Sequence, residues 1–241
     1  AKGLSSALII RKIFVAYTLG FEEIEVLVDD SEIKNTSSKY PSPNEEFPKK
    51  LTAHEVITFI NLSGVEIIEQ EKDRYLLGVL VSSDKVEFYK AFRRLFALIQ
   101  TYGEELLEYI KSGFKGSENS LYAKEIIINK FYRLCLRTIN TSICGLEKTC
   151  LYSIVNNLEE IGDIYWYIVK NGKPKKLNTE LIKRFQEYID IFSQFSLVFF
   201  KNSEERYQEI YESIKLLGKK IMENYGEISY LQMQLFALSK N

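Results

Sequence analysis

The sequence predicts an α+β protein that is mostly helical, with a small head of order α-β-α-β-β followed by two antiparallel three-helix bundles. Three observations predict this class. Short alternating, β-branched segments occur only in the first 82 residues. From residue 84 onward, apolar residues recur at helical spacing. Gly, Pro and Asn-Ser breaks divide that part into six segments of helical length joined by short loops, a pattern typical of antiparallel bundles.

The head is expected to begin with a helix over residues 5–18, where apolar residues recur at positions 8, 9, 13 and 16 before a stop at Gly20. Residues 24–28 alternate and are rich in β-branched side chains, which predicts a strand. Residues 29–50 are polar and hold three of the four prolines, so they are predicted to form a long loop.

A second helix is predicted over 52–62, because Thr52 and Glu55 have the spacing of a capping box. Two strands, 65–70 and 74–81, follow with only three residues between them, which indicates a hairpin. The head is therefore expected to have three main strands and two helices.

The helical part is predicted to contain six helices, with breaks at glycine, proline or polar residues between them. Their expected ranges are 84–112, 118–140, 147–171, 178–201, 203–224 and 227–240. Six helices divide naturally into two sets of three. The predicted domains are a head over 1–82, a first bundle over 83–172 and a second, degenerate bundle over 173–241.

Composition excludes several classes of protein. Apolar residues make up 46% of the 241 residues and the net charge is −1, so a sizeable core can form and no global field draws the chain to nucleic acid. No apolar run approaches the roughly 20 residues that a membrane-spanning helix needs, and the N-terminus does not resemble a signal peptide. We therefore expect a cytoplasmic protein with no membrane segment and no direct nucleic-acid site.

The reactive side chains are few. The chain has three cysteines, Cys135, Cys144 and Cys150, and one histidine, His54, so neither a disulfide framework nor a Cys/His zinc site is expected. The cysteines lie in apolar helical sequence and are predicted to be buried and inert. His54 lies in the predicted capping turn, and the chain has no phosphate-binding loop. We therefore expect that the protein is not an enzyme.

Glu159 and Asp163 are the most informative polar pair. They are four residues apart on a predicted helix, so both carboxylates lie on one face, where they border the apolar stripe. Three interpretations stay open: a solvated acidic edge, a pair neutralised by Arg133 or Arg137 of the preceding helix, or a cation site. Oxygen ligands of this kind suit Mg²⁺, Ca²⁺ or Mn²⁺, or iron in a bridged cluster.

Glu125 and Asn129 repeat the same spacing on the preceding helix. Asn129 offers a carbonyl oxygen without a charge, so an ion held there gains less than it would from a second carboxylate. We expect at most one weakly bound divalent ion, with Glu159, Asp163 and Glu125 as its ligands.

An ordered set of segments resembles one family. Residues 157–163 (NLEEIGD) resemble the NLERIGD helix of PhoU proteins. Four further segments resemble the PhoU subfamily that carries an N-terminal AbrB-like DNA-binding domain: 16–26 (AYTLGFEEIEV), 64–70 (GVEIIEQ), 93–96 (RRLF) and 130–134 (KFYRL). The matches keep their order along the chain.

The resemblance implies a negative regulator of phosphate uptake that contacts a phosphate transporter or its signalling protein and forms a homodimer. It also implies bound iron or zinc, with Glu159 and Asp163 as ligands and Glu125 as their partner. Asn129 departs from the family motif, which has Asp there, and the last predicted helix lacks the motif. The AbrB-like domain is expected upstream of residue 1. The alternatives are a transcriptional regulator whose DNA-binding domain lies upstream, or a metal-binding helical bundle of carboxylate type.

Overall fold

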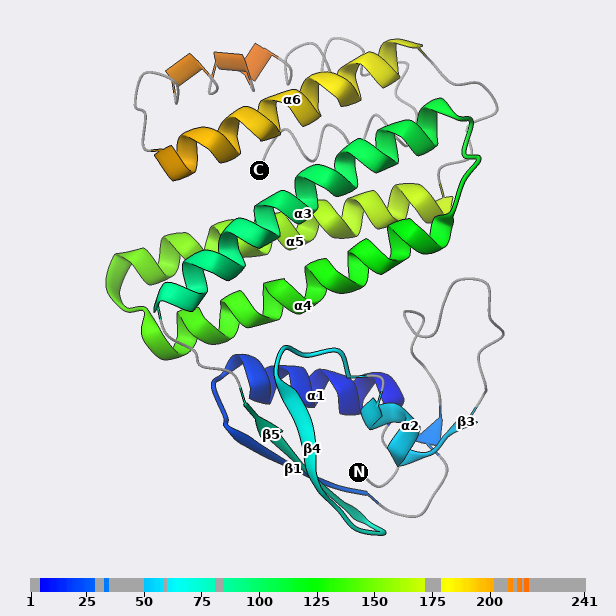
Figure 1. The fold of residues 1–241 in the computed structure, drawn as a ribbon, viewed down its shortest axis with the longest axis vertical. Coiled ribbons are helices and arrows are strands. Elements are labelled where there is room, and N and C mark those ends of the chain that lie inside the picture. The colour runs from blue at the N-terminus through cyan, green and yellow to red at the C-terminus, as the bar shows by residue number, and fades with distance from the viewer. Residues whose placement is uncertain are drawn as a thin grey trace. The chain divides into compact units, whose positions relative to one another are not determined.

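The computed structural model is an α+β fold made mostly of helices, with a small three-stranded antiparallel sheet, as predicted (Figure 1). The residues that the structure describes are 5–28, 33–34, 50–58, 60–80, 85–171, 179–201, 208–209, 212–213 and 215–216. The predicted helices over 203–224 and 227–240 lie largely or wholly outside the described residues. The predicted domain boundaries at 82 and 172 stay predictions.

The chain divides into two compact units. Unit 1 comprises Ala1–Leu95 and Ile126–Asn156, and unit 2 comprises Phe96–Glu125 and Asn157–Asn241. Three long helices contribute residues to both units: α3 (Lys85–Lys111), α4 (Glu118–Ser142) and α5 (Gly145–Asn171). Unit 2 also contains α6 (Thr179–Lys201).

The head in unit 1 is built from α1 (Ser6–Thr18), β1 (Glu23–Leu27), α2 (Ala53–Thr58), β4 (Val65–Gln70) and β5 (Arg74–Val79). The strand order is β1-β5-β4 and every pairing is antiparallel. Figure 1 shows α1 lying along one face of this sheet. Its buried face supplies Ile9, Ile10, Ile13 and Tyr17 to the core of the head.

Hydrogen-bonded capping motifs mark the end of α1 and the start of α2. Gly20, at φ +98°, ends α1: its N–H donates to the Tyr17 carbonyl, and the Phe21 N–H donates to the Ala16 carbonyl. This is a Schellman arrangement. In α2 the predicted capping box is present, because the Thr52 N–H donates to Glu55 Oε2 (2.7 Å) and the Glu55 N–H donates to Thr52 Oγ1 (3.2 Å).

Two details of the head differ from the sequence prediction. Helix α2 ends at Thr58 rather than Leu62. Within the segment predicted as a loop, β2 (Ile33–Lys34) pairs with β3 (Lys50–Leu51) in a second, two-stranded sheet. Strands of two residues leave no alternation to detect, because the signal needs about four residues.

Aromatic side chains form much of the core of unit 2. Tyr165 of α5 packs edge-to-face against Tyr102 of α3 and Phe185 of α6. Gly103 makes this contact close, since a Cβ there would lie 2.9 Å from the Tyr165 hydroxyl oxygen. A second cluster surrounds Phe96, whose ring contacts four phenylalanines of α6: Phe192, Phe195, Phe199 and Phe200.

Candidate functional site

The predicted carboxylates lie in the helices where the sequence placed them. Glu125 on α4 is 3% exposed, whereas Glu159 and Asp163 on α5 are half-buried. All three belong to unit 2. Burial of Glu125 is the notable feature, because an ionised carboxylate is rarely placed inside a protein without compensation.

Tyr102 connects two of these carboxylates electrostatically. Its hydroxyl is fully buried and makes no hydrogen bond among the described residues. The pKa of Tyr102 is raised well above its ordinary value of 10, first by burial and then by the charges of Glu125 and Asp163. Glu125 of α4 and Asp163 of α5 therefore lie within electrostatic range of Tyr102 of α3, and we refer to these three side chains of unit 2 as the acidic cluster.

The described residues of this cluster supply few of the ligands that a metal ion needs. In the part of the chain that the structure describes, no group of three or more His, Cys, Asp or Glu side chains is arranged to hold an ion. Divalent cations such as Ca²⁺ take six to eight oxygen ligands, and Mg²⁺ takes six. Among the described residues this cluster offers fewer ligands than such an ion takes, and we derive no chemistry from one.

Asn129 and the two arginines of α4 belong to unit 1. Arg133 donates from Nη2 to Asn129 Oδ1 (3.2 Å), and its guanidinium carbon lies 3.8 Å from the centroid of the Phe14 ring on α1. Asn129 thus accepts a hydrogen bond from a cationic side chain of its own helix. The hypothesis that Arg133 or Arg137 neutralises Glu159 and Asp163 joins residues of different units and stays a prediction.

Arg137 links α4 to the head through two hydrogen bonds. It is 3% exposed, and Nη1 donates to the carbonyl oxygens of Tyr17 (2.9 Å) and Phe21 (2.8 Å). Asn140, nearly one turn later, donates to the Thr18 carbonyl (2.8 Å). The last carbonyls of a helix lack partners within it and carry the negative end of its dipole. A buried cation is therefore well placed at the end of α1.

This joint between α4 and the head was not predicted from the sequence. Gly20 is part of it, since a Cβ there would lie 2.5 Å from Thr141 Cγ2. From the sequence, Gly20 was predicted only as the residue that ends the first helix. Pairings across about 120 residues leave no local pattern by which Arg137 could have been assigned to these carbonyls.

The side chains considered for catalysis have structural or exposed positions. His54 is exposed in the first turn of α2, as predicted, and its ring lies 6.2 Å from that of Tyr75. Cys135 is buried, and burial raises the pKa of its thiol well above 9. The prediction of burial is wrong for Cys144 and Cys150, which are exposed. Cys144 lies in the connection between α4 and α5, and Cys150 lies on the outer side of the first turns of α5.

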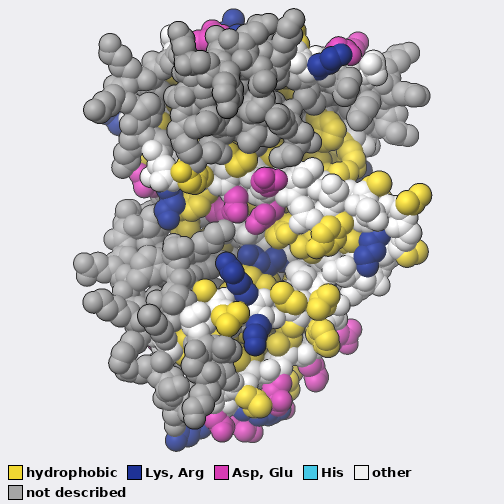
Figure 2. Space-filling view, turned by 180° about the vertical axis from the view of Figure 1, so that it is seen from behind, with side chains coloured by type: hydrophobic (Ala, Val, Ile, Leu, Met, Phe, Trp, Pro, Cys, Tyr) yellow, Lys and Arg dark blue, Asp and Glu magenta, His cyan; other side chains and the backbone are white. Residues whose placement is uncertain are grey.

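The head exposes large apolar side chains beside acidic ones. Leu8 and Val15 of α1 and its C-cap residue Leu19 are 41%, 56% and 60% exposed, and their spacing of seven and four places them on one side of the helix. On the sheet, Leu27 and Ile68 are 57% and 46% exposed. Figure 2 shows apolar side chains at the surface of the head, next to acidic side chains.

The outward face of the sheet carries an excess of negative charge. Glu23 and Glu25 of β1 are exposed, as are Glu66 and Glu69 of β4. Arg74 of β5 contacts two of these carboxylates, with Nε 2.6 Å from Glu25 and Nη1 2.7 Å from Glu69. Among the described residues of these strands, one arginine lies among four carboxylates, so this face is acidic.

Comparison with known proteins places the chain in no group, since no family model, no curated protein and no solved structure matches it. None of the described helices is long and apolar enough to cross a membrane.

Proposed function

We propose that this protein is a PhoU-like regulator of phosphate uptake or phosphate-responsive signalling, which acts by contact with a phosphate transporter or its signalling protein. The ordered sequence resemblance over residues 8–171 supports the class of function. We further propose a homodimer in the cytoplasm as its working form.

The observation that carries the contact mechanism is the surface of the head. Leu27 and Ile68 are exposed on a sheet face that also holds four glutamates. Exposed apolar groups rimmed by charge are typical of surfaces that bind other proteins.

Phosphate uptake in a strain that lacks the gene tests this proposal. We expect labelled-phosphate uptake in phosphate-rich medium to stay several-fold above the wild-type rate, and the plasmid-borne gene to lower it again. Uptake that responds to external phosphate as it does in the wild type would contradict the proposal. Light scattering over a wide concentration range tests the homodimer, which a constant monomer mass would exclude.

Metal binding is a second candidate function, favoured by one observation. Glu125 and Asp163 both raise the pKa of the buried Tyr102 hydroxyl, so carboxylates from two helices lie within electrostatic range of one group. Glu159 lies one helical turn before Asp163 on α5. These residues would be the ligands of a divalent ion such as iron, zinc or magnesium.

A further inference from the structure

We propose that the groove beside β1, a cavity between α1 and β1 in the head, binds a small amphipathic carboxylate, in which an aliphatic chain carries one negative charge. The ligand site goes beyond the proposed function and does not depend on it. Three properties of the groove identify the class of ligand: its volume, its aliphatic walls and the position of one lysine.

The described lining of the groove lies within the head. Its cavity of about 320 Å³ is lined by Ile9, Lys12 and Ile13 of α1 and by residues 24–27 of β1. All of these residues belong to unit 1. Small-molecule sites in proteins are concave and usually have volumes of about 300–1,000 Å³. The groove is at the lower end of that range, so its ligand must be small.

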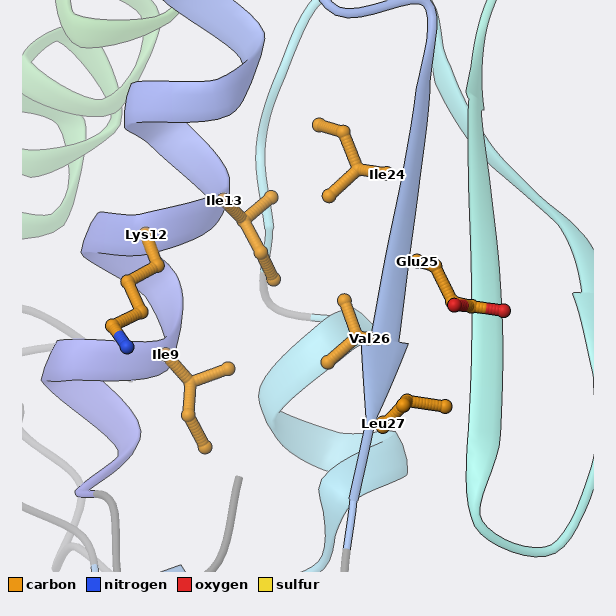
Figure 3. A pocket seen from close by; sticks show the side chains of 7 residues that line it. All are labelled: Ile9, Lys12, Ile13, Ile24, Glu25, Val26 and Leu27. Carbon is orange, nitrogen blue, oxygen red and sulfur yellow. The ribbon is translucent and has the colours of Figure 1, made fainter.

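Aliphatic side chains form the walls of the groove. Figure 3 shows Ile24 and Val26 pointing from β1 toward α1, and Ile13 pointing from α1 toward β1. Together with Ile9 they belong to the buried core of the head. A polar group placed against these side chains would lose its hydrogen bonds to water and gain none in return. The part of the ligand that enters the groove must therefore be apolar.

Lys12 places a cation beside these walls. It is exposed and lies three residues after Ile9, so the two side chains are neighbours on α1. Among the residues that the structure describes, its ammonium takes part in no salt bridge or hydrogen bond. Glu25 is the acidic residue of the described lining, but Figure 3 shows it on the opposite side of the strand, where it accepts a hydrogen bond from Arg74 Nε (2.6 Å). The charge of Lys12 is therefore available to an anion.

The nearby charges on α1 also favour an anion. Arg11 is exposed beside Lys12, and α1 contains no acidic residue. A phosphate dianion is usually held by several arginines or by successive backbone N–H groups, whereas the described lining supplies one lysine. One ammonium matches the single charge of a carboxylate. We therefore assign the groove to a carboxylate with an aliphatic tail.

The volume of the groove sets the length of that tail. If each non-hydrogen atom takes about as much space as a water molecule in the liquid, about 30 Å³, the cavity has room for about ten such atoms. A carboxylate with roughly eight carbons, such as octanoate, has this size. A ligand of about ten atoms reaches only modest affinity, so we expect a Kd on the order of 0.1–1 mM.

NMR of the full chain with isotope-labelled isoleucine methyl groups tests this site, with octanoate as the probe. The signals are assigned by single substitutions such as Ile13→Val and Ile24→Val. We expect the methyl signals of Ile13 and Ile24 to shift and to saturate together. Ile57 is the matched control, because it is buried in the same core but does not belong to the described lining of the groove. Its methyl signal should not shift.

Related ligands separate the contribution of the tail from that of the charge. Affinity should rise by up to about fourfold for each added methylene. It should level off near roughly eight carbons, where the groove is filled. Octanol lacks the charge and octylamine reverses it, so both should bind at least about threefold more weakly than octanoate. Octanol that binds as well as octanoate, or affinity that keeps rising in much longer carboxylates, would overturn the inference.

Protein variants provide a second matched control. Lys12 and Arg11 are adjacent, exposed cations, but only Lys12 belongs to the described lining of the groove. We expect Lys12→Gln to weaken octanoate binding about three- to fivefold, the effect of one exposed ion pair, and Arg11→Gln to leave it unchanged. Lys12→Glu should reverse the preference, so that octylamine binds more tightly than octanoate.

Three further results would overturn the inference. They are the absence of a saturable shift at Ile13 and Ile24 up to roughly 10 mM octanoate, equal effects of Lys12→Gln and Arg11→Gln, or a shift of the Ile57 methyl as large as that of Ile13. Because the labelled-phosphate uptake test measures the effect of the gene in cells, this site and the proposed function can each fail alone.

Discussion

Replacement of Arg137 by methionine should destabilise unit 1 by about 2–4 kcal/mol. The guanidinium donates two hydrogen bonds to the Tyr17 and Phe21 carbonyls, and its carbon lies 5.1 Å from the centroid of the Tyr17 ring. Hydrogen bonds from a charged donor contribute about 1.5–3 kcal/mol each, and a cation at a helix end adds about 0.3–1 kcal/mol. Burial, which lowers the pKa of Arg137, offsets part of that gain because methionine needs no desolvation.

Urea denaturation followed by far-UV circular dichroism measures this change as the free energy of unfolding. Arg137→Lys should lower the free energy of unfolding by about half as much as Arg137→Met, because an ammonium keeps the charge but not the planar geometry of the donors. Arg11→Met is the matched control on the exposed side of α1, with an expected change below about 0.5 kcal/mol. If Arg137→Met falls within about 1 kcal/mol of the wild type, the assignment of Arg137 as the cap of α1 is wrong.

Four further outcomes follow from single contacts. Gly20→Ala should cost about 2–4 kcal/mol, because φ is +98° and the new Cβ meets Thr141 Cγ2; Thr141→Ser should restore part of the loss in a double-mutant cycle. Hydrogen bonds from Thr52 lower the pKa of Glu55 below its ordinary value of 4.5. The ionised Glu55 carboxylate therefore stabilises the folded state above pH 4.5, and this contribution is lost as pH falls through the folded-state pKa. The gap in denaturation midpoint between wild type and Glu55→Gln should therefore close in acid, and a gap that widens would contradict this. Tyr102→Phe should leave stability unchanged or raise it by up to about 1 kcal/mol, since the buried hydroxyl makes no described hydrogen bond; a loss measured by the same denaturation would mean that the hydroxyl is used. Elemental analysis of protein purified without chelator should find less than one divalent ion per chain. A stoichiometric ion that is lost in Glu159→Ala would contradict the prediction that these carboxylates bind an ion only weakly.

Elements with a strong local signal could be predicted from the sequence. The α1 helix, the β4–β5 hairpin and the capping box at Thr52 each depend on residues within a few positions of one another. Their physical causes, such as the reciprocal hydrogen bonds of Thr52 and Glu55, are local as well. The prediction of an α+β class was correct for this reason.

Which face of a helix is buried was harder to predict. The predicted stripe of α1 included Leu8, which is 41% exposed, and omitted Tyr17, which is 0% exposed. Tyr17 packs in the core of the head, where its hydroxyl donates to the Ser63 carbonyl (3.0 Å) and the Arg137 guanidinium lies by its ring. Both partners are distant in sequence, so no periodicity could indicate them.

The residues of the candidate site could be predicted from the sequence, but their burial could not. Glu125, Glu159 and Asp163 were identified from helical spacing alone, which cannot say how deeply a residue lies. The burial of Glu125 depends on neighbours from other helices, Tyr102 among them. Likewise, the groove beside β1 forms only when residues of α1 and β1 come together in the folded head.

Photo-crosslinking in cells tests most directly whether the head makes the regulatory contact. A photoreactive residue at Leu27, which is 57% exposed on β1, is compared with one at Leu146, which is 86% exposed at the start of α5. The account predicts an adduct from position 27 that contains a component of the phosphate transporter or its signalling protein, and little or none from position 146. Equal adducts from both positions, or an adduct from position 27 with a protein that has no part in phosphate uptake or signalling, would contradict it.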